Sequence, residues 1–174
     1  MSPDAVAQMA FQLAFKRLHG TMPSVYESCT TRWFHRGRTE VIRSCTTESA
    51  DFVSAMESES KGKDTLREAL NAAATKHITV AKAAAKGEGV DRHMLAMRSA
   101  AAAAAAGGGG EGNRAGEDFF GDPLVAESAG WRLSTSNLSP PFLSSFGFGP
   151  VAGNGYGLGY NIDGDRITVP VTAF

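Results

Sequence analysis

Trp131-Arg132-Leu133-Ser134-Thr135-Ser136 is the stretch that decides the fold, because it predicts a short strand that ends in a polar turn. Two further strands are predicted downstream, at Tyr156 to Asn161 and at Arg166 to Phe174, with an Asp163-Gly164 turn between them. Together these segments predict a sheet in the last third of the sequence.

A capped helix is predicted at the other end of the sequence. Ser2 or Asp4 can accept hydrogen bonds from free backbone N–H groups, and Pro3 suits a first turn. Gly20 should end the helix just after Leu18. The apolar stripe expected to be buried consists of Val6, Met9, Ala10, Leu13 and Ala14.

The middle of the chain continues the mixture of strands and helices. Residues 21–45 combine Thr, Ser and aromatic groups as extended segments do. Helical patterns cover 47–56, 63–87 and 91–106, and residues 99–117 form a low-complexity Ala/Gly insertion, expected to be flexible where Gly takes over. The predicted fold class is therefore α/β, a mixed sheet with flanking helices.

Composition excludes several classes of protein. The 174 residues suit about one domain. A net charge of −1 gives no overall field to hold a polyanion or an anionic membrane. Cys29 and Cys45 show neither a metal-binding nor a disulfide pattern, which fits a reducing compartment. No apolar run approaches a transmembrane segment of roughly 20 residues, and no signal peptide is expected.

The four histidines do not predict a catalytic or metal centre. His19, His35, His77 and His93 are scattered, with no pair at ligand spacing, so surface or satisfied core positions are expected for each. We therefore predict no metal site and assign none of them as a general base.

A cluster of cations and aromatics leaves two interpretations open. Arg32, Arg36 and Arg38 surround Trp33 and Phe34, as in platforms that bind single-stranded nucleic acid. The alternative is a Trp/Phe pair that faces the core, with arginines at its rim. The neutral net charge favours the second interpretation, and no nucleic-acid partner is expected.

A set of polar residues points to recognition of a carboxylate. Tyr26, Thr39 and Arg92 could together hold one, since Arg supplies a charged fork and the hydroxyls supply neutral donors. The hydroxyl run Ser134-Thr135-Ser136 is weak evidence alone, because such clusters commonly bond to the local backbone.

A series of sequence blocks resembles the carnitine/choline acyltransferase family, in order and spacing. The blocks are Ser2 to Ala5, Gln8 to Phe15, Arg17 to Gly20, Tyr26 to Ser28, Arg32, Phe34 to Thr39, Ile42 to Ser44, Asp91 to His93, Leu133 to Ser136, Phe148 to Val151, Gly155 to Gly157, and Tyr160 with Asn161. The resemblance implies that residues 1–174 are the carboxyl-terminal part of such a domain, similar to one half of the two-domain chloramphenicol-acetyltransferase-like fold.

The resemblance also implies a reaction. An acyl group, acetyl by preference, passes directly between coenzyme A and carnitine in a ternary complex, with acyl-CoA as co-substrate and no tightly bound cofactor. The family's catalytic histidine belongs to an amino-terminal half that this sequence lacks, so the 174 residues alone are expected to be inactive.

Carnitine-site roles follow from the same resemblance. Tyr26, Ser28 and Thr39 match carnitine-binding positions, and Arg92 matches the arginine that pairs with carnitine's carboxylate and so selects carnitine over choline. Ser134 and Phe148 match positions around the trimethylammonium group, where an aromatic face is apt.

The resemblance assigns the remaining roles to four residues. Ser136 matches the serine that stabilises the oxyanion. Asp4 and Asn137 match coenzyme A positions, and Phe146 is bulky where long-chain enzymes carry Gly, which favours short acyl groups.

The remaining expectations concern location and rival functions. The family resemblance implies a mitochondrion or peroxisome, although the sequence itself carries no targeting signal. The leading rival is a non-catalytic fragment or a module that binds carnitine or a partner; a nucleic-acid module that uses Arg32, Arg36 and Arg38 comes second.

Overall fold

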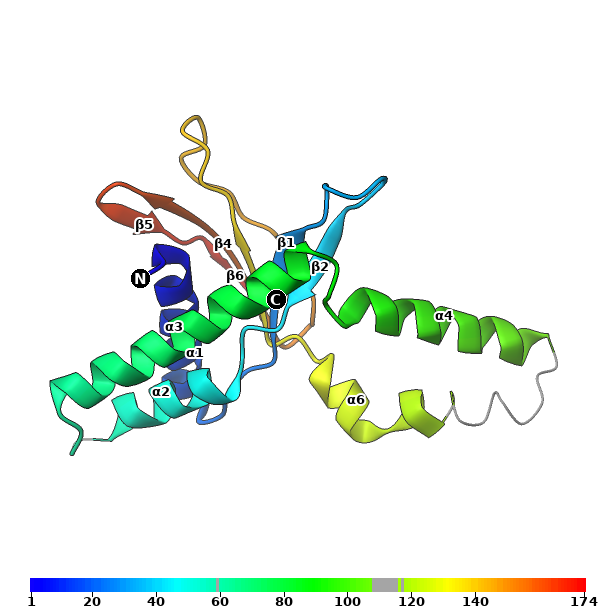
Figure 1. Cartoon of the computed structure of the whole chain (residues 1–174), viewed down its shortest axis with the longest axis horizontal. Coiled ribbons are helices and arrows are strands. Elements are labelled where there is room, and N and C mark those ends of the chain that lie inside the picture. Colours follow the sequence, from blue (N-terminus) through cyan, green and yellow to red (C-terminus); the bar gives the residue numbers. More distant parts are fainter. Residues whose placement is uncertain (59, 108–115, 117) are drawn as a thin grey trace.

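One mixed sheet organises the computed structural model, which describes residues 1–58, 60–107, 116 and 118–174 (Figure 1). The helices are α1 (Pro3–His19), α2 (Thr47–Glu57), α3 (Lys63–Ala85), α4 (Asp91–Ala106) and α6 (Pro123–Ser128). The strands are β1 (Val25–Thr30), β2 (Thr39–Ile42), β3 (Leu133–Asn137), β4 (Tyr156–Asp163), β5 (Arg166–Thr168) and β6 (Val171–Thr172). The α/β prediction is confirmed.

The sheet has the strand order β2-β1-β3-β4-β5, and β6 also pairs with β4. The central pairs β1–β3 and β3–β4 are parallel, while β2 joins β1 and both β5 and β6 join β4 in antiparallel fashion. The predicted strand at 166–174 is interrupted before β6. Pro170 lies in this break, and it has no N–H to donate to a ladder.

The caps of α1 confirm its predicted ends. Ser2 Oγ accepts a hydrogen bond from Ala5 N at 3.4 Å, and Gly20 adopts a left-handed φ of 74° while its N–H donates to Lys16 O. Helix α4 likewise runs to Ala106 as predicted, but the flexibility expected at residues 108–110 lies outside the described residues.

The buried face of α1 differs from the predicted apolar stripe. Ala10 and Ala14 are exposed, whereas Gln8 and Gln12 are completely buried. Tertiary partners explain the difference: Gln8 Nε2 donates to Thr135 Oγ1 and Tyr160 OH, and Gln12 donates to the Ser44 carbonyl. A buried amide is tolerated when it is hydrogen bonded. The predicted stripe is therefore correct at Met9, which is 1% exposed, and wrong at the two alanines.

Three helices cover one face of the sheet. In α1, Phe15 packs with Val25, Leu133 and Leu158 from three strands, and in α3 Ala84 packs against Cys29 of β1. Helix α2 contacts α1 and α3, not the strands, and closes a second cluster around Met9, Phe52, Val53 and Ala73. Helices α4 and α6 lie beyond β2, away from the three helices α1, α2 and α3 (Figure 1). Helix α4 has no buried residue.

Among the described residues, no helix combines the length and apolar character of a transmembrane span. Both cysteines are free thiols.

Candidate functional site

The face of the sheet away from α1 and α3 gathers most of the predicted site. Neighbouring residues on paired strands share a face, so the pair Tyr26–Ser134 lies on one side together with Ser28 and Ser136, at alternate positions of β1 and β3. Ser28 Oγ donates to Ser136 Oγ at 3.1 Å. Because Ser136 accepts that bond, its own hydroxyl proton remains available to another acceptor.

Two aromatic residues lie over β4 on the same face. Gly157 and Gly159 are the β4 partners of Ser134 and Ser136. A Cβ at Gly159 would lie 2.6 Å from the Phe146 carbonyl oxygen, and one at Gly157 would lie 2.5 Å from that of Phe148. The two rings stack with centroids 6.4 Å apart. These glycines therefore let the segment with both predicted aromatics approach the serines.

The predicted residues differ in accessibility. Ser134 is fully buried, and its Oγ has no hydrogen-bond partner among the described residues. A ligand could touch it only after its cover moves. Thr39 is exposed and pairs with Thr30 at the opposite end of β1 from Tyr26. The fold thus places Thr39 on the same strand pair without bringing it next to Tyr26.

A pocket joins Tyr26 to Arg92. Its volume is about 190 Å³, and its lining includes Tyr26, Arg43, Asp91, Arg92 and Trp131. Trp131 meets the Tyr26 ring edge-on at 5.5 Å and carries the Arg43 guanidinium over its own ring. The Arg92 side chain is 45% exposed. The side chains of Tyr26, Trp131 and Arg92 therefore meet in one pocket, which lies between α4 and the face of the sheet away from α1 and α3.

Asn137 ends β3 on the side that the helices cover, and Asp4, in the first turn of α1, lies next to it. Asp4 Oδ1 accepts hydrogen bonds from Asn137 Nδ2 at 2.8 Å and from Tyr160 OH at 2.6 Å. Burial, then the Asp4 charge, raises the pKa of Tyr160 well above its usual range. The two predicted coenzyme A residues are thus joined to each other, and they lie across the sheet from Ser136.

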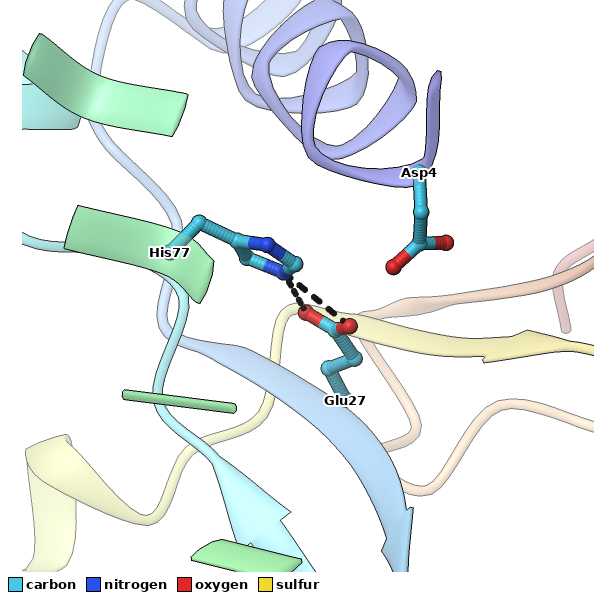
Figure 2. A group of neighbouring side chains, drawn as sticks. All are labelled: Asp4, Glu27 and His77. Carbon is cyan, nitrogen blue, oxygen red and sulfur yellow. Dashed lines mark hydrogen bonds and ion pairs between the residues drawn. The ribbon is translucent and has the colours of Figure 1, made fainter. Parts of the chain in front are cut away.

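A buried carboxylate–histidine cluster lies beside them, unforeseen from the sequence (Figure 2). His77 Nε2 lies 2.8 Å and 3.1 Å from the two Glu27 oxygens, and side-chain oxygens of Asp4 complete a group whose ligand atoms lie within 4.8 Å of one another. His77 and Glu27 are 50 residues apart, so no local spacing could reveal the pair. His77 does occupy a core position, which was one of the alternatives expected, but its Nδ1 has no hydrogen-bond partner among the described residues.

Electrostatics explain how this cluster stays buried. Burial raises the pKa of Glu27, while the hydrogen bond and charge of Glu27 raise the pKa of His77 against the opposing effect of its own burial. Both shifts favour retention of a proton by the folded pair. Carboxylate and imidazole groups are ligands that zinc accepts. His77 Nε2 is already hydrogen bonded to Glu27, however, so this pair holds together without an ion.

The cationic aromatic segment is a surface turn between β1 and β2. Trp33 is 79% and Phe34 is 50% exposed, so the interpretation of a core-facing pair is wrong. Arg32, Arg36 and Arg38 are exposed beside them. The tight turn, in which Arg36 has a φ of 58°, lifts these side chains away from the sheet.

Comparison with known proteins gives one family. The family model described as Choline/Carnitine o-acyltransferase matches residues 1–174. A putative mitochondrial carnitine O-acetyltransferase of Saccharomyces cerevisiae is 35% identical over 99% of the chain and 24% of its own length. The muscle isoform of human carnitine O-palmitoyltransferase 1 is 37% identical over 95% of the chain and 22% of its own.

A third relative, carnitine O-acetyltransferase of Columba livia, is 34% identical over the whole chain and 26% of its own length. The chain therefore spans about a quarter of the length of the curated relatives it matches.

Proposed function

The chain belongs to the choline/carnitine O-acyltransferase family, and from this premise we propose that it carries the carnitine-binding and oxyanion-stabilising part of a coenzyme A-dependent carnitine acyltransferase. The observation that carries the proposal is the convergence of Tyr26, Ser28, Ser134 and Ser136 on one face, with Arg92 in the adjoining pocket.

Carnitine recognition is assigned to the pocket between Tyr26 and Arg92. The guanidinium would pair with the carboxylate, and the Tyr26 hydroxyl would add a neutral hydrogen bond. The Phe148 ring lies over the strand that carries Gly157, where a quaternary ammonium could pack against it. Choline has no carboxylate to match Arg92, which favours carnitine as the substrate.

Ser136 is assigned the role of stabilising the negative charge that develops on the acyl oxygen during transfer. A general base takes the proton of carnitine's hydroxyl, and the oxygen attacks the acyl carbonyl. As the tetrahedral intermediate collapses, the C–S bond breaks and the base returns the proton to sulfur, so that coenzyme A leaves as the thiol. Ser136 accepts the hydrogen bond from Ser28, so its own O–H can donate a hydrogen bond to the oxyanion. The base is proposed to come from outside these 174 residues; within them His77 lies on the helix-covered side of the sheet, where it contacts Glu27, and Ser136 lies on the other side.

The finer assignments rest on the family resemblance. Asp4 and Asn137 are proposed to contact coenzyme A, and Asn137 is exposed enough to do so. Phe146 over Gly159 is proposed to restrict the acyl chain to acetyl or another short group. A mitochondrial location is proposed because two of the relatives are named as mitochondrial enzymes.

The first experiment measures carnitine binding to the 174-residue chain by NMR titration. Arg92→Ala should weaken binding roughly tenfold or more, because a hydrogen bond to a charged group contributes about 1.5–3 kcal/mol. Ser136→Ala should leave the affinity nearly unchanged, since its partner forms only in the transition state. Absence of binding by the unaltered chain would refute the proposal.

The second experiment measures transfer. This chain would replace the matching segment of the Columba livia carnitine O-acetyltransferase, and thiol release from acetyl-CoA would be followed with carnitine. Ser136→Ala should lower kcat by about 100-fold or more. Carnitine binding without transfer in the chimera would favour the rival function, a non-catalytic carnitine-binding module.

A further inference from the structure

Glu40 is a buried carboxylate at the edge of the proposed site, with no role assigned so far. It lies on β2, is only 2% exposed, and directs its side chain toward the start of α4. Its Oε1 accepts from Val41 N at 2.7 Å and lies 3.7 Å from Arg92 Nε, while its Oε2 accepts from Arg92 N at 3.2 Å. Both oxygens are thus in use, and one residue of α4 receives contacts to its backbone and its side chain.

The start of α4 depends on this carboxylate. The cap residue Val90 makes no side-chain hydrogen bond to the helix, so the first N–H groups need other acceptors. Glu40 supplies one, and its negative charge also suits the positive end of the helix dipole. Gly89 leaves the space for it, because a Cβ there would lie 2.4 Å from Glu40 Cγ.

The ion pair between Arg92 Nε and Glu40 Oε1, at 3.7 Å, favours one direction of the guanidinium. The group is planar, so holding Nε and the backbone limits where its two terminal nitrogens can point. Neither terminal nitrogen hydrogen bonds to a residue in the described part of the chain, and both belong to a side chain that lines the Tyr26 pocket. The fork of the guanidinium is left available to an anion.

We infer that Glu40 is a positioning residue: it anchors the start of α4 and holds the Arg92 side chain so that its two terminal nitrogens meet the carboxylate of the bound alcohol. This rests on the proposed function, since it requires that Arg92 bind carnitine. Glu40 touches no substrate atom and acts only through Arg92.

A second anchor of the same helix supplies a matched control. Asp91 accepts a bidentate pair from Arg43, with Nε and Nη2 at 2.9 Å and 2.7 Å from its oxygens. Like Glu40, it fixes the beginning of α4 to β2 and its flank, but it has no contact with the Arg92 side chain among the described interactions. Because Asp91 also lines the Tyr26 pocket, Asp91→Asn is a control for the stability of the helix and not for carnitine affinity.

The test is a double-mutant cycle on the 174-residue chain, with carnitine affinity measured by NMR titration and stability by thermal unfolding. Glu40→Gln keeps the shape of the side chain but replaces one of its two acceptor oxygens with an NH2 group. The hydrogen bond from either Val41 N or Arg92 N is therefore lost. We expect Kd to rise roughly tenfold, and by less than about twofold when Arg92 is already alanine. Gly89→Ala, which pushes on the Glu40 side chain without changing any charge, should reproduce the effect.

The outcomes separate the two proposals. If Arg92→Ala weakens carnitine binding but Glu40→Gln leaves it unchanged, strengthens it, or weakens it equally in both Arg92 backgrounds, the positioning role is wrong and the proposed function stands. If Arg92→Ala itself has no effect, the proposed carnitine site fails first. Asp91→Asn should lower the melting temperature by an amount comparable to Glu40→Gln, which shows how much of the Glu40 effect on stability comes from a loosened helix start.

Discussion

Removal of the His77 side chain should destabilise the chain more than almost any other single truncation. His77 is 3% and Glu27 5% exposed at the side chain, and the two are joined at 2.8 Å (Figure 2). His77→Ala would leave the Glu27 carboxylate buried without its partner. Breaking a buried pair from one side costs about 3–5 kcal/mol, a large fraction of the roughly 5–15 kcal/mol that stabilises a typical domain.

The magnitude can be read as a melting temperature. At about 2–4 °C per kcal/mol for a chain of this size, the loss corresponds to a decrease on the order of 10 °C. Circular dichroism would follow thermal and urea unfolding. Lys76→Ala is the control: Lys76 is adjacent on α3, but its ion pair with Glu48 is exposed at 3.8 Å, and such pairs contribute about 1 kcal/mol or less.

Two results would refute this reasoning. One is a His77→Ala variant no less stable than Lys76→Ala. The other concerns Glu27→Leu combined with His77→Leu, which removes both charged groups and should be less destabilising than His77→Ala, since no carboxylate is left unpaired. If the double variant were the least stable of the three, packing and not the charge pair would hold α3 to β1.

Three further predictions concern pH, close packing and acyl length. The pKa values of Glu27 and His77 are both raised in the folded state, the first by burial and the second because the interaction with Glu27 outweighs burial. The folded state therefore binds the proton more tightly than the unfolded state, and the free energy of unfolding should fall as pH rises above about 6.5. His77→Ala should flatten this slope between pH 6 and 8. Gly159→Ala should cost about 1–3 kcal/mol in urea unfolding, because its Cβ meets the Phe146 carbonyl at 2.6 Å, whereas Gly153→Ala, with no atom within 4 Å, should be close to neutral. Phe146→Gly in the chimeric enzyme should raise palmitoyl relative to acetyl turnover, and a preference for palmitoyl before the change would contradict the role of Phe146.

Local rules predicted the ends of the elements well. Ser2 and Gly20 bound α1 through a side-chain cap and a left-handed residue, and both effects depend only on a few neighbouring atoms. The α/β class followed from the same kind of reasoning, since helical and extended patterns alternate along the chain.

Partners distant in sequence could not be predicted in this way. Gln8 is buried because Thr135 and Tyr160, more than a hundred residues away, receive its amide protons. His77 and Glu27 meet only once α3 lies across β1. The helix itself and its buried Met9 were therefore predicted correctly, but the buried glutamines were missed.

The candidate site divides along the same line. The family resemblance named Tyr26, Ser28, Ser134 and Ser136, and the sheet register brings these four together on one face. Glu40 escaped notice, because nothing in its neighbouring residues predicts that its carboxylate meets the start of α4.

The alternation along β3 has a consequence for how this protein can change over evolutionary time. Leu133 and Thr135 turn toward the helices and hold the domain together, while Ser134 and Ser136 turn toward the open face. Exchange of a serine for another side chain leaves the other set in place, so substrate preference can drift by substitution at little risk to folding. Insertion or deletion of one residue would swap the two sets, moving Leu133 to the face of the substrate-binding serines and a serine to the helix-covered core. The amino acids of β3 that face the substrate should therefore vary among related proteins, while the number of residues in the strand stays the same.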